Sequence, residues 1–509
     1  MAAVTGMTSP IPASREICQN TDQGTFAIED PSPGTRHHTL LSSNDSPTDS
    51  DIELIRSVLA ESDRRLQSVH EEIQNLKLQP QAESADSARI LQRLEEALVW
   101  DAGKFDLEAS PWLLTHVCGL WRAVSLSMPL LWSQIAIDYV DSEPPIRYSL
   151  RLAETQLRRA GPLKVHFYSS ETMDAGPQLE MFNLLASQCS RWEELSIGLT
   201  SIITPSLLLP LRDRLPSLRR VALQISHSLS ASTELQCLDC FDSAPSLVDF
   251  DCFHERSFLP ITLPVGLFVR YGLNAPWERH LQILNQASNL VEARIQIAFQ
   301  GDADWPDLPA HAVNLVHLRR LFVSHAFALC YLRAPNLEQL ALVDRSDSMK
   351  SLNSYFRPFV SRSSCQIRRL ILGSPSAKTL VEILIHTSHI TELVIMEDED
   401  SDTYDVFETL EASGYIIAPQ LTLIFLACTD LFRIHYTPFL KMLESRWRAE
   451  VCPLQHAALL VDGGHKPSSS TLDGLMKLRQ DGLDLKMIVD DDDAALLAMK
   501  GWDFQNTWN

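Results

Sequence analysis

The chain has 509 residues, 45% of them hydrophobic, which is enough for two or three domains or for one long repeat array with a buried core. Its 43 basic and 65 acidic residues give a formal charge of -22, which repels phosphate groups and excludes general binding to nucleic acid or to an anionic membrane. The ten cysteines are scattered and no secretory leader is recognisable, so reduced thiols in a soluble cytoplasmic or nuclear protein are expected.

The N-terminal part predicts a tail followed by a helix. Residues 1–47 are rich in Ser, Thr, Pro and Gly and poor in large apolar groups, so we expect a disordered tail. From Ile52 to Leu76, apolar residues recur at alternating steps of three and four, which predicts a heptad helix over 48–78. This helix either packs within the chain or forms a coiled-coil dimer. A length of about three and a half heptads is marginal for a dimer and favours packing within the chain.

The segment Ser110–Ile135 carries the most informative pattern, SPWLLTHVCGLWRAVSLSMPLLWSQI. Its first part has apolar residues at helical spacing, and Pro129 then stops the helix because proline cannot continue the hydrogen-bond ladder. The pattern predicts a small helical module at 87–135. The residues that define it are Pro111, Trp112, Leu113, Leu114, Val117, Cys118, Trp121, Arg122, Leu126, Pro129, Leu131 and Trp132.

This pattern resembles the second half of the F-box in the large F-box-like, leucine-rich-repeat family known chiefly from fungi. F-boxes dock onto the Skp-type adaptor of cullin-RING (SCF-type) ubiquitin ligases. The resemblance therefore implies that these twelve residues form an adaptor-docking module, with Trp121 and Trp132 mainly structural because large aromatics at helical spacing usually lie in a core. The leucine-proline-x-glutamate-isoleucine-leucine signature of the first F-box helix is not found in residues 77–107, so the predicted module is partial.

From about residue 190, a short signature recurs: an apolar residue, two variable residues, an apolar residue, one variable residue and an apolar residue. The spacing ranges from 19 residues, Leu318 to Leu337, to 43 residues, Leu247 to Leu290. Helical patterns fill several intervals. The sequence thus predicts an α/β fold, an irregular leucine-rich-repeat solenoid over 160–489 with some poorly paired strands. The central apolar residues of the ten copies are Leu195, Val221, Phe250, Ala293, Leu321, Leu340, Leu370, Leu393, Ile424 and Ala457.

Few residues suggest chemistry. Cys237, Cys240, Cys252 and His254 are zinc-ligand types, but the neighbouring apolar residues favour a helix with small buried thiols. Asp490–Asp493 lack the alternate spacing of a calcium loop, and we interpret 490–509 as an acidic C-terminal tail. Phosphate-binding loops and nucleophile elbows have no match in the sequence. We therefore expect no enzyme, cofactor or metal.

Strand alternation predicts which residues face away from the repeat core. In the later copies several of these are large and apolar, which suggests a surface for an unknown protein target. The alternative is that a C-terminal segment, 465–509, covers them. The expected function is a non-catalytic F-box-like substrate receptor, and the second interpretation is a repeat scaffold without ubiquitin-ligase coupling. The candidate target surface comprises Phe322, Ile371, Val394, Met396, Leu423 and Phe425.

Overall fold

The computed structural model describes residues 112–489 with internal gaps, and these residues fall into two compact units. One unit includes the described residues 112–125 and the other begins at Leu126. We call them the N-terminal unit and the sheet unit. The predicted tail at 1–47, heptad helix at 48–78 and acidic tail at 490–509 lie outside the described residues. The gaps are 113, 118, 141–147, 227–236, 254–257, 298–304, 309–310, 344–351, 398–402, 413–415, 429–434, 453 and 462–466.

The described part of the N-terminal unit is short and helical. It holds α4 (Leu114–Val117) and most of α5 (Gly119–Ser127). The Thr115 amide donates to the Trp112 carbonyl at 2.9 Å, and the Arg122 Nε donates to the Thr115 carbonyl at 2.7 Å. The arginine thus reaches from one short helix to the other.

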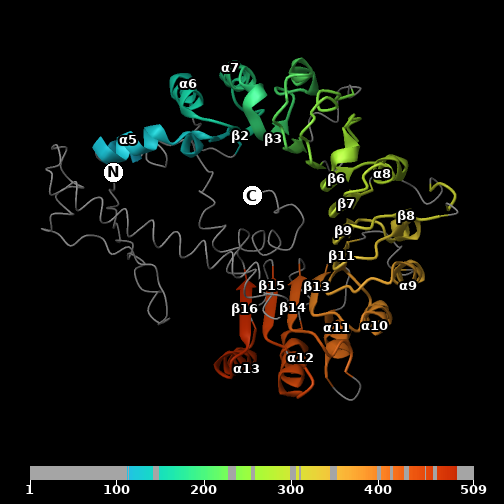
Figure 1. Ribbon diagram of the computed structural model, residues 1–509. Helices are drawn as coiled ribbons and strands as arrows, with labels where there is room; N and C mark the ends of the chain where they lie inside the picture. Colours follow the sequence, from blue (N-terminus) through green and yellow to red (C-terminus); the bar gives the residue numbers. More distant parts are fainter. Residues whose placement is uncertain are drawn as a thin grey trace, which may run out of the picture. The chain divides into compact units, whose positions relative to one another are not determined.

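The sheet unit is built on one 14-stranded sheet in which the strands follow one another in chain order (Figure 1). Every neighbouring pair in this sheet is parallel, and the pairing keeps its register, with one shift at Leu163/Lys164. The strands are β1 (Gln134–Asp138), β2 (Leu163–Tyr168), β3 (Trp192–Leu199), β4 (Arg220–Ile225), β5 (Asp249–Phe253), β6 (Arg270–Asn274), β7 (Glu292–Gln296), β9 (Arg320–Val323), β11 (Gln339–Leu342), β12 (Arg369–Gly373), β13 (Glu392–Glu397), β14 (Leu423–Cys428), β15 (His456–Val461) and β16 (Asp484–Val489). A second, two-stranded sheet pairs β8 (Val313–Asn314) with β10 (Leu332–Arg333).

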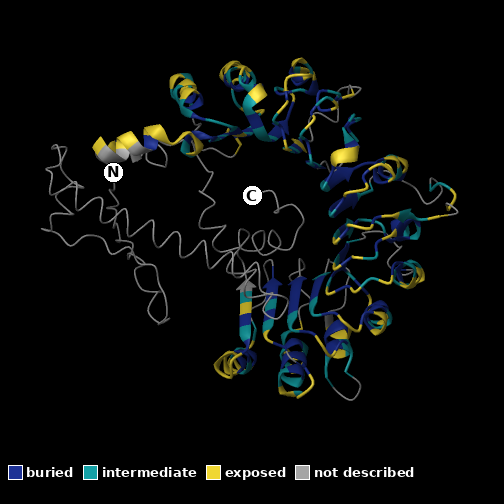
Figure 2. Cartoon of the chain, viewed as in Figure 1, coloured by how far each residue is buried: buried dark blue, intermediate teal, exposed yellow. Residues whose placement is uncertain are grey.

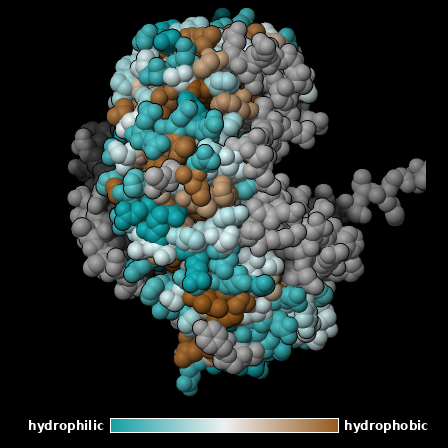
Figure 3. Space-filling model, turned by 90° about the vertical axis from the view of Figure 1, so that its right-hand side faces the viewer, coloured by the Kyte–Doolittle hydropathy of each residue, from teal (hydrophilic) through white to brown (hydrophobic). Residues whose placement is uncertain are grey.

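The connections between strands lie on one face of the 14-stranded sheet (Figure 1). The helices in them expose one side and bury the other against the strands (Figure 2). Hydrophilic and hydrophobic groups are intermixed on the outer surface around α8 and the neighbouring connections (Figure 3). The helices are α6 (Leu150–Arg159), α7 (Ala175–Ala186), α8 (Trp277–Leu284), α9 (Leu352–Ser363), α10 (Ala377–His386), α11 (Thr403–Leu410), α12 (Tyr436–Arg448) and α13 (Ser469–Gln480), with 3-10 helices η1 (Pro129–Trp132), η2 (Cys189–Arg191), η3 (Pro205–Leu207), η4 (Leu209–Leu211), η6 (Val265–Leu267) and η8 (Ala326–Tyr331).

The core lies between the strands and these connections. In β4, Val221 and Leu223 face the connections and are at most 2% exposed. Register places Val221 between Leu195 of β3 and Phe250 of β5, which are also buried. The recurring apolar positions of the sequence therefore form continuous buried rows, each side chain contributing about 1.5 to 3 kcal/mol by leaving water.

The fold class predicted from the sequence is wrong. The described residues form a large parallel sheet with helices, an α/β architecture, but not the predicted leucine-rich-repeat solenoid. The strand recurs, whereas the connections differ in kind: η3 and η4 stand between β3 and β4, and a helix of 12 residues stands between β11 and β12. The expectation of poorly paired strands is also wrong, because backbone pairing is continuous across the sheet.

The helical F-box-like module predicted at 87–135 is not found in the described residues either. Its residues divide between the two units after Ser125, and Gln134 and Ile135 belong to the edge strand β1. Pro129 does end the helical segment, but it begins η1, which leads directly into that strand. The physical reason is that Trp132 and Ile135, both 0% exposed, are part of the sheet core.

All ten predicted signature copies contain a strand of the 14-stranded sheet, and the four other strands of that sheet, β1, β2, β6 and β16, were not predicted. The strands β8 and β10 of the small sheet were not predicted either. The missed strand β6 lies inside the 43-residue interval between Leu247 and Leu290. Its signature is Phe268, Tyr271 and Leu273, which has the recurring spacing with a tyrosine at the central position. An aromatic residue with a polar group was therefore enough to hide one copy.

Arginines in three connections reach back to carbonyl groups of the preceding connection. Arg446 of α12 is completely buried, and its guanidinium donates to the carbonyls of Leu410 at 2.5 Å and Ile417 at 2.7 Å. Arg362 of α9 donates to the Leu332 carbonyl at 2.9 Å. Arg191 of η2 donates to the Leu157 carbonyl at 3.0 Å. These contacts satisfy carbonyl groups at the ends of helices and loops, which otherwise cost about 1 to 3 kcal/mol each when buried.

A buried histidine joins three elements. His280 of α8 is 0% exposed; its Nδ1 lies 2.9 Å from the Tyr271 hydroxyl and its Nε2 lies 3.0 Å from the Gln296 carbonyl oxygen. A carbonyl oxygen only accepts, so Nε2 carries the proton and Nδ1 accepts from tyrosine. Burial lowers the pKa of His280 to about 4, although the backbone contacts raise it. The neutral imidazole is thus the form that fits this position.

The pH dependence of stability tests this position. Because the pKa of His280 is lower in the folded chain, its contribution is present above about pH 6.5 and is lost as pH falls toward 4, on the order of 3 kcal/mol in total. We expect His280→Gln to be less stable than wild type at pH 7 and to lose less further stability between pH 6.5 and 4 in urea unfolding. The exposed His386→Gln is the matched control. Equal pH slopes for wild type and His280→Gln would contradict the prediction.

Within the described residues, no helix combines the length and the apolar character needed to cross a membrane.

Candidate interaction face of the sheet

The sheet face opposite the helices is the candidate functional surface, and we call it the open face. Residues alternate along each strand, so in β4 Arg220, Ala222 and Gln224 belong to the open face while Val221 and Leu223 face the connections. In-register pairing aligns these positions across the sheet. The open face therefore carries rows of side chains that run perpendicular to the strands.

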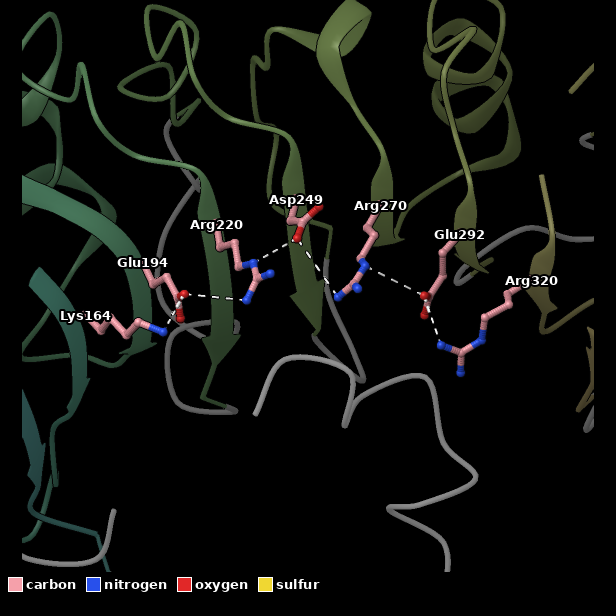
Figure 4. A network of polar contacts seen from close by, with 7 residues as sticks. All are labelled: Lys164, Glu194, Arg220, Asp249, Arg270, Glu292 and Arg320. Carbon is pink, nitrogen blue, oxygen red and sulfur yellow. Dashed lines mark hydrogen bonds and ion pairs between the residues drawn. The ribbon is translucent and has the colours of Figure 1, made fainter. Parts of the chain in front are cut away.

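One row is a ladder of alternating charges across seven strands (Figure 4). Each member is the direct register partner of the next, because all stand at corresponding positions near the strand starts. We call this row the charged ladder. It consists of Lys164, Glu194, Arg220, Asp249, Arg270, Glu292 and Arg320.

Ion pairs connect the first part of the charged ladder. Lys164 Nζ lies 2.9 Å from Glu194 Oε1, and Arg220 Nη1 lies 3.5 Å from the same oxygen. Arg220 Nε is 3.0 Å from Asp249 Oδ2, which Arg270 Nη1 approaches to 4.0 Å. Each arginine therefore bridges two carboxylates on neighbouring strands.

The second part continues toward the middle of the sheet. Arg270 Nε lies 3.9 Å from Glu292 Oε2, and Arg320 Nη1 lies 3.1 Å from that oxygen. The Arg320 Nε also donates to the Gln339 side chain at 3.1 Å. Arg320 thus ends the unbroken alternation of charge by contacting a neutral amide on β11.

The carboxylates of the charged ladder are more buried than its arginines. The side chains of Asp249 and Glu292 are 6% and 9% exposed, against 38% for Arg220 and 32% for Arg270. Burial raises the pKa of Asp249, and the nearby guanidinium groups of Arg270 and Arg220 only partly oppose this. The ladder therefore presents positive groups to the surroundings, and its anionic groups cost solvation free energy.

A second region of the open face is apolar and lies over β9 to β15. Phe322, Ala341, Ile371, Val394, Phe425 and Ala458 are consecutive register partners on neighbouring strands. These six residues and four more from the two neighbouring rows pack into one cluster, which we call the apolar cluster. Its members are Phe322, Ala341, Ile371, Val394, Met396, Leu423, Phe425, Ala427, Ala458 and Leu460.

An arginine marks the boundary between the two regions. Arg294 of β7 is the register partner of Phe322 of β9, and its guanidinium lies over the Phe322 ring, 5.5 Å from the centroid. Arg294 is 9% exposed. On its other side, Gly272 leaves room for the Asp251 carboxylate, because a Cβ at Gly272 would lie 1.9 Å from Asp251 Oδ1. In the row of Phe322 the open face thus changes from polar to apolar across β7 and β9. The row at the strand starts still carries an ion pair beyond this point, between Arg369 of β12 and Glu392 of β13 at 3.6 Å.

The structure brings all six residues of the predicted target surface together in the apolar cluster. A target surface free for binding would require all six to be exposed, and this is not found, because Val394, Phe425 and Ile371 are 1%, 4% and 6% exposed. Phe322, Met396 and Leu423 are half-buried. The charged ladder was not recognised from the sequence. In the sequence, the ladder corresponds to charges of alternating sign at the residue just before the central apolar residue of successive signature copies. This alternation predicts ion pairs only if the strands are known to pair in register.

The predicted adaptor-docking residues have several different environments. Trp112 and Trp132 are buried, and Arg159 lies 4.4 Å over the Trp132 ring. Leu126 and Pro129 are exposed, Arg122 is exposed and Leu131 is half-buried. Pro111, Leu113 and Cys118 lie outside the described residues, and Leu114, Val117 and Trp121 are described only as parts of helices. Trp132, which was expected to be mainly structural, is 0% exposed.

The cysteines considered as zinc ligands are not arranged as a metal site in the described residues. Cys240 and Cys252 are buried, and burial raises the pKa of Cys240 to about 12. The prediction of a helix around Cys237 and Cys240 is wrong. Leu238 forms an isolated β-bridge with Ile261, and turns follow it. His254 lies outside the described residues. In the part of the chain that the structure describes, no three His, Cys, Asp or Glu side chains are placed to hold a metal ion.

In comparison with known proteins, neither a family model nor a curated protein matches the chain. The resemblance to the F-box-like family therefore stays a prediction from the residues quoted above.

Replacement of Phe425 by alanine measures how much the apolar cluster contributes to stability. The ring is almost fully buried, so we expect Phe425→Ala to lower the free energy of unfolding by roughly 3 kcal/mol, and the half-buried Phe322→Ala to cost less. A thermal melt of the two variants and wild type checks this. A melting temperature of Phe425→Ala equal to that of wild type would instead assign the ring to an accessible binding surface.

Proposed function

We propose that this chain is a non-catalytic receptor of the cytoplasm or nucleus that binds a protein target on the open face of its sheet. The observation that carries the proposal is the charged ladder. Its seven residues extend across six strand spacings, or about 29 Å. A row of that length fits a protein segment better than a small molecule.

The chemistry of the row indicates what it binds. The chain as a whole is strongly acidic, with a formal charge of -22, yet the ladder turns its arginines outward and buries two of its carboxylates. Arginine is enriched at protein interfaces and pairs with carboxylates through two parallel hydrogen bonds. The net charge opposes polyanions such as nucleic acid at long range. A protein segment with spaced carboxylates is therefore the favoured target.

Burial of Asp249 supports the same proposal. Exposed cross-strand ion pairs contribute only about 0.2 to 1 kcal/mol each, and desolvation of the carboxylate reduces that gain. Stability alone is thus a weak explanation for placing seven charges in one row. An apolar partner row would hold the strands at least as well. A role in recognition explains why charged residues occupy these positions.

Alanine variants of the ladder test target binding. We expect Arg220→Ala with Arg270→Ala to weaken capture of a protein target by the tagged full chain, by about tenfold or more, because truncation leaves target carboxylates unpaired. Raised salt should weaken the wild-type complex as well. The control is Arg212→Ala, whose ion pair joins the connection before β4 to Asp239 in the connection after β4. Equal capture by the ladder variant and the control would contradict binding at the ladder.

Coupling to a cullin-RING ubiquitin ligase through a Skp-type adaptor is the second part of the proposal. It is supported by the F-box-like pattern in 111–132 and by three exposed apolar side chains close together in the sequence. Leu126, Met128 and Leu130 are 41%, 46% and 72% exposed. Exposed apolar groups concentrated in one short segment usually mark a protein contact.

Direct binding of a Skp-type adaptor to the full chain tests this coupling. We expect micromolar or tighter binding, and a loss of at least about tenfold in Leu126→Asp with Leu130→Asp, because a charge opposes burial of the apolar contact. Leu267→Asp is the control, since Leu267 is 45% exposed in η6. Absence of wild-type binding would leave the alternative, a scaffold without ubiquitin-ligase coupling.

A further inference from the structure

The apolar cluster is buried although it lies on the face of the sheet opposite the helices. Val394 and Phe425 are 1% and 4% exposed, and Ala427 is 2% exposed. Side chains on a sheet face stand roughly perpendicular to the sheet, so lateral neighbours on the same face leave their outer ends uncovered. Such low exposure requires atoms that lie over the cluster.

The end of β16 lies beside this cluster. Val489 is the register partner of Val461 on β15, and Leu460, one residue earlier, belongs to the cluster. From β16 to β14 there are two strand spacings, about 10 Å. The chain continues for residues 490–509 beyond this point. Only a few extended residues, at about 3.3 Å each, are needed to reach Phe425 and Ala427.

The sequence of 490–509 fits an apolar surface after a polar beginning. Four aspartates, Asp490–Asp493, come first and favour a solvated change of direction. Large apolar side chains follow, in greater density than an exposed tail requires. They are Leu496, Leu497, Met499, Trp502, Phe504 and Trp508. Aromatic residues supply large contact areas, and three of them stand within seven positions, 502–508.

We propose that residues 490–509 bind in cis to the apolar cluster on the open face of β12–β15. The contact holds the cluster out of water in the resting chain, whether or not a target binds at the charged ladder.

The experiment measures access to the cluster in the full chain. Ala427→Cys places a thiol inside the apolar cluster, and Ala222→Cys places one on the open face of β4, at the register row of Phe425 but outside the cluster. Each is combined with Trp502→Ser, Phe504→Ser and Trp508→Ser together, or with Trp502→Ser alone. Maleimide labelling is read peptide by peptide by mass spectrometry, which separates the new thiol from the native cysteines.

We expect the triple substitution to raise the labelling rate at position 427 by about tenfold or more, equivalent to about 1.4 kcal/mol, with a smaller rise for Trp502→Ser alone. Labelling at position 222 should not change. A synthetic peptide of residues 490–509, added to the triple variant, should restore protection at position 427. Circular dichroism melts establish that each variant is folded.

Two results would overturn the proposal. Unchanged labelling at position 427 in the folded triple variant would mean that another segment of the chain covers the cluster. Protection that increases with protein concentration would mean that a second copy of the chain covers it. Neither result bears on the ladder variants, because Arg220 and Arg270 lie outside the cluster.

Discussion

In-register hydrogen bonding between neighbouring parallel strands is the constraint on which the rest of this molecule depends. Because the register is kept from β1 to β16 with a single shift, a residue type that recurs at one position of successive strands becomes a continuous row in space. Rows such as Leu195, Val221 and Phe250 form the core. Positions one residue away from these core rows point to the opposite face of the sheet. There the same in-register pairing produces the charged ladder and the apolar cluster.

The rows differ in what they contribute. Buried apolar side chains contribute roughly 1.5 to 3 kcal/mol each, whereas a cross-strand ion pair contributes about 0.2 to 1 kcal/mol. The fold therefore depends on the core rows, and the open face is left to vary. Over β2–β9 it carries the charged ladder, and over β9–β15 it carries the apolar cluster, whose central members are buried. Arg294, whose guanidinium lies over the Phe322 ring, stands at the boundary between the two regions.

The sequence allowed the strand positions to be predicted because period-two alternation with a fixed apolar spacing is a local signal. It allowed six of the ten members of the apolar cluster to be predicted for the same reason, but not their burial, which depends on what lies over the sheet. Tyr271 concealed β6, since a central tyrosine, which carries a polar hydroxyl, did not match the apolar pattern. The charged ladder was missed because Glu194 and Arg220 are ordinary surface residues until register makes them neighbours. The prediction of a helical module at 87–135 was wrong because Pro129 indicates where a helix ends but not that a strand follows.

The arginines that reach back to the preceding connection have a consequence for how the sheet unit opens. Arg446, Arg362 and Arg191 each satisfy carbonyl groups that belong to the neighbour on their N-terminal side. When such a connection unfolds, its neighbour loses hydrogen-bond donors at the same moment, so adjacent segments open together as larger cooperative blocks. In hydrogen exchange, the segments around α11 and α12 should therefore lose protection as one block, with a shared opening free energy.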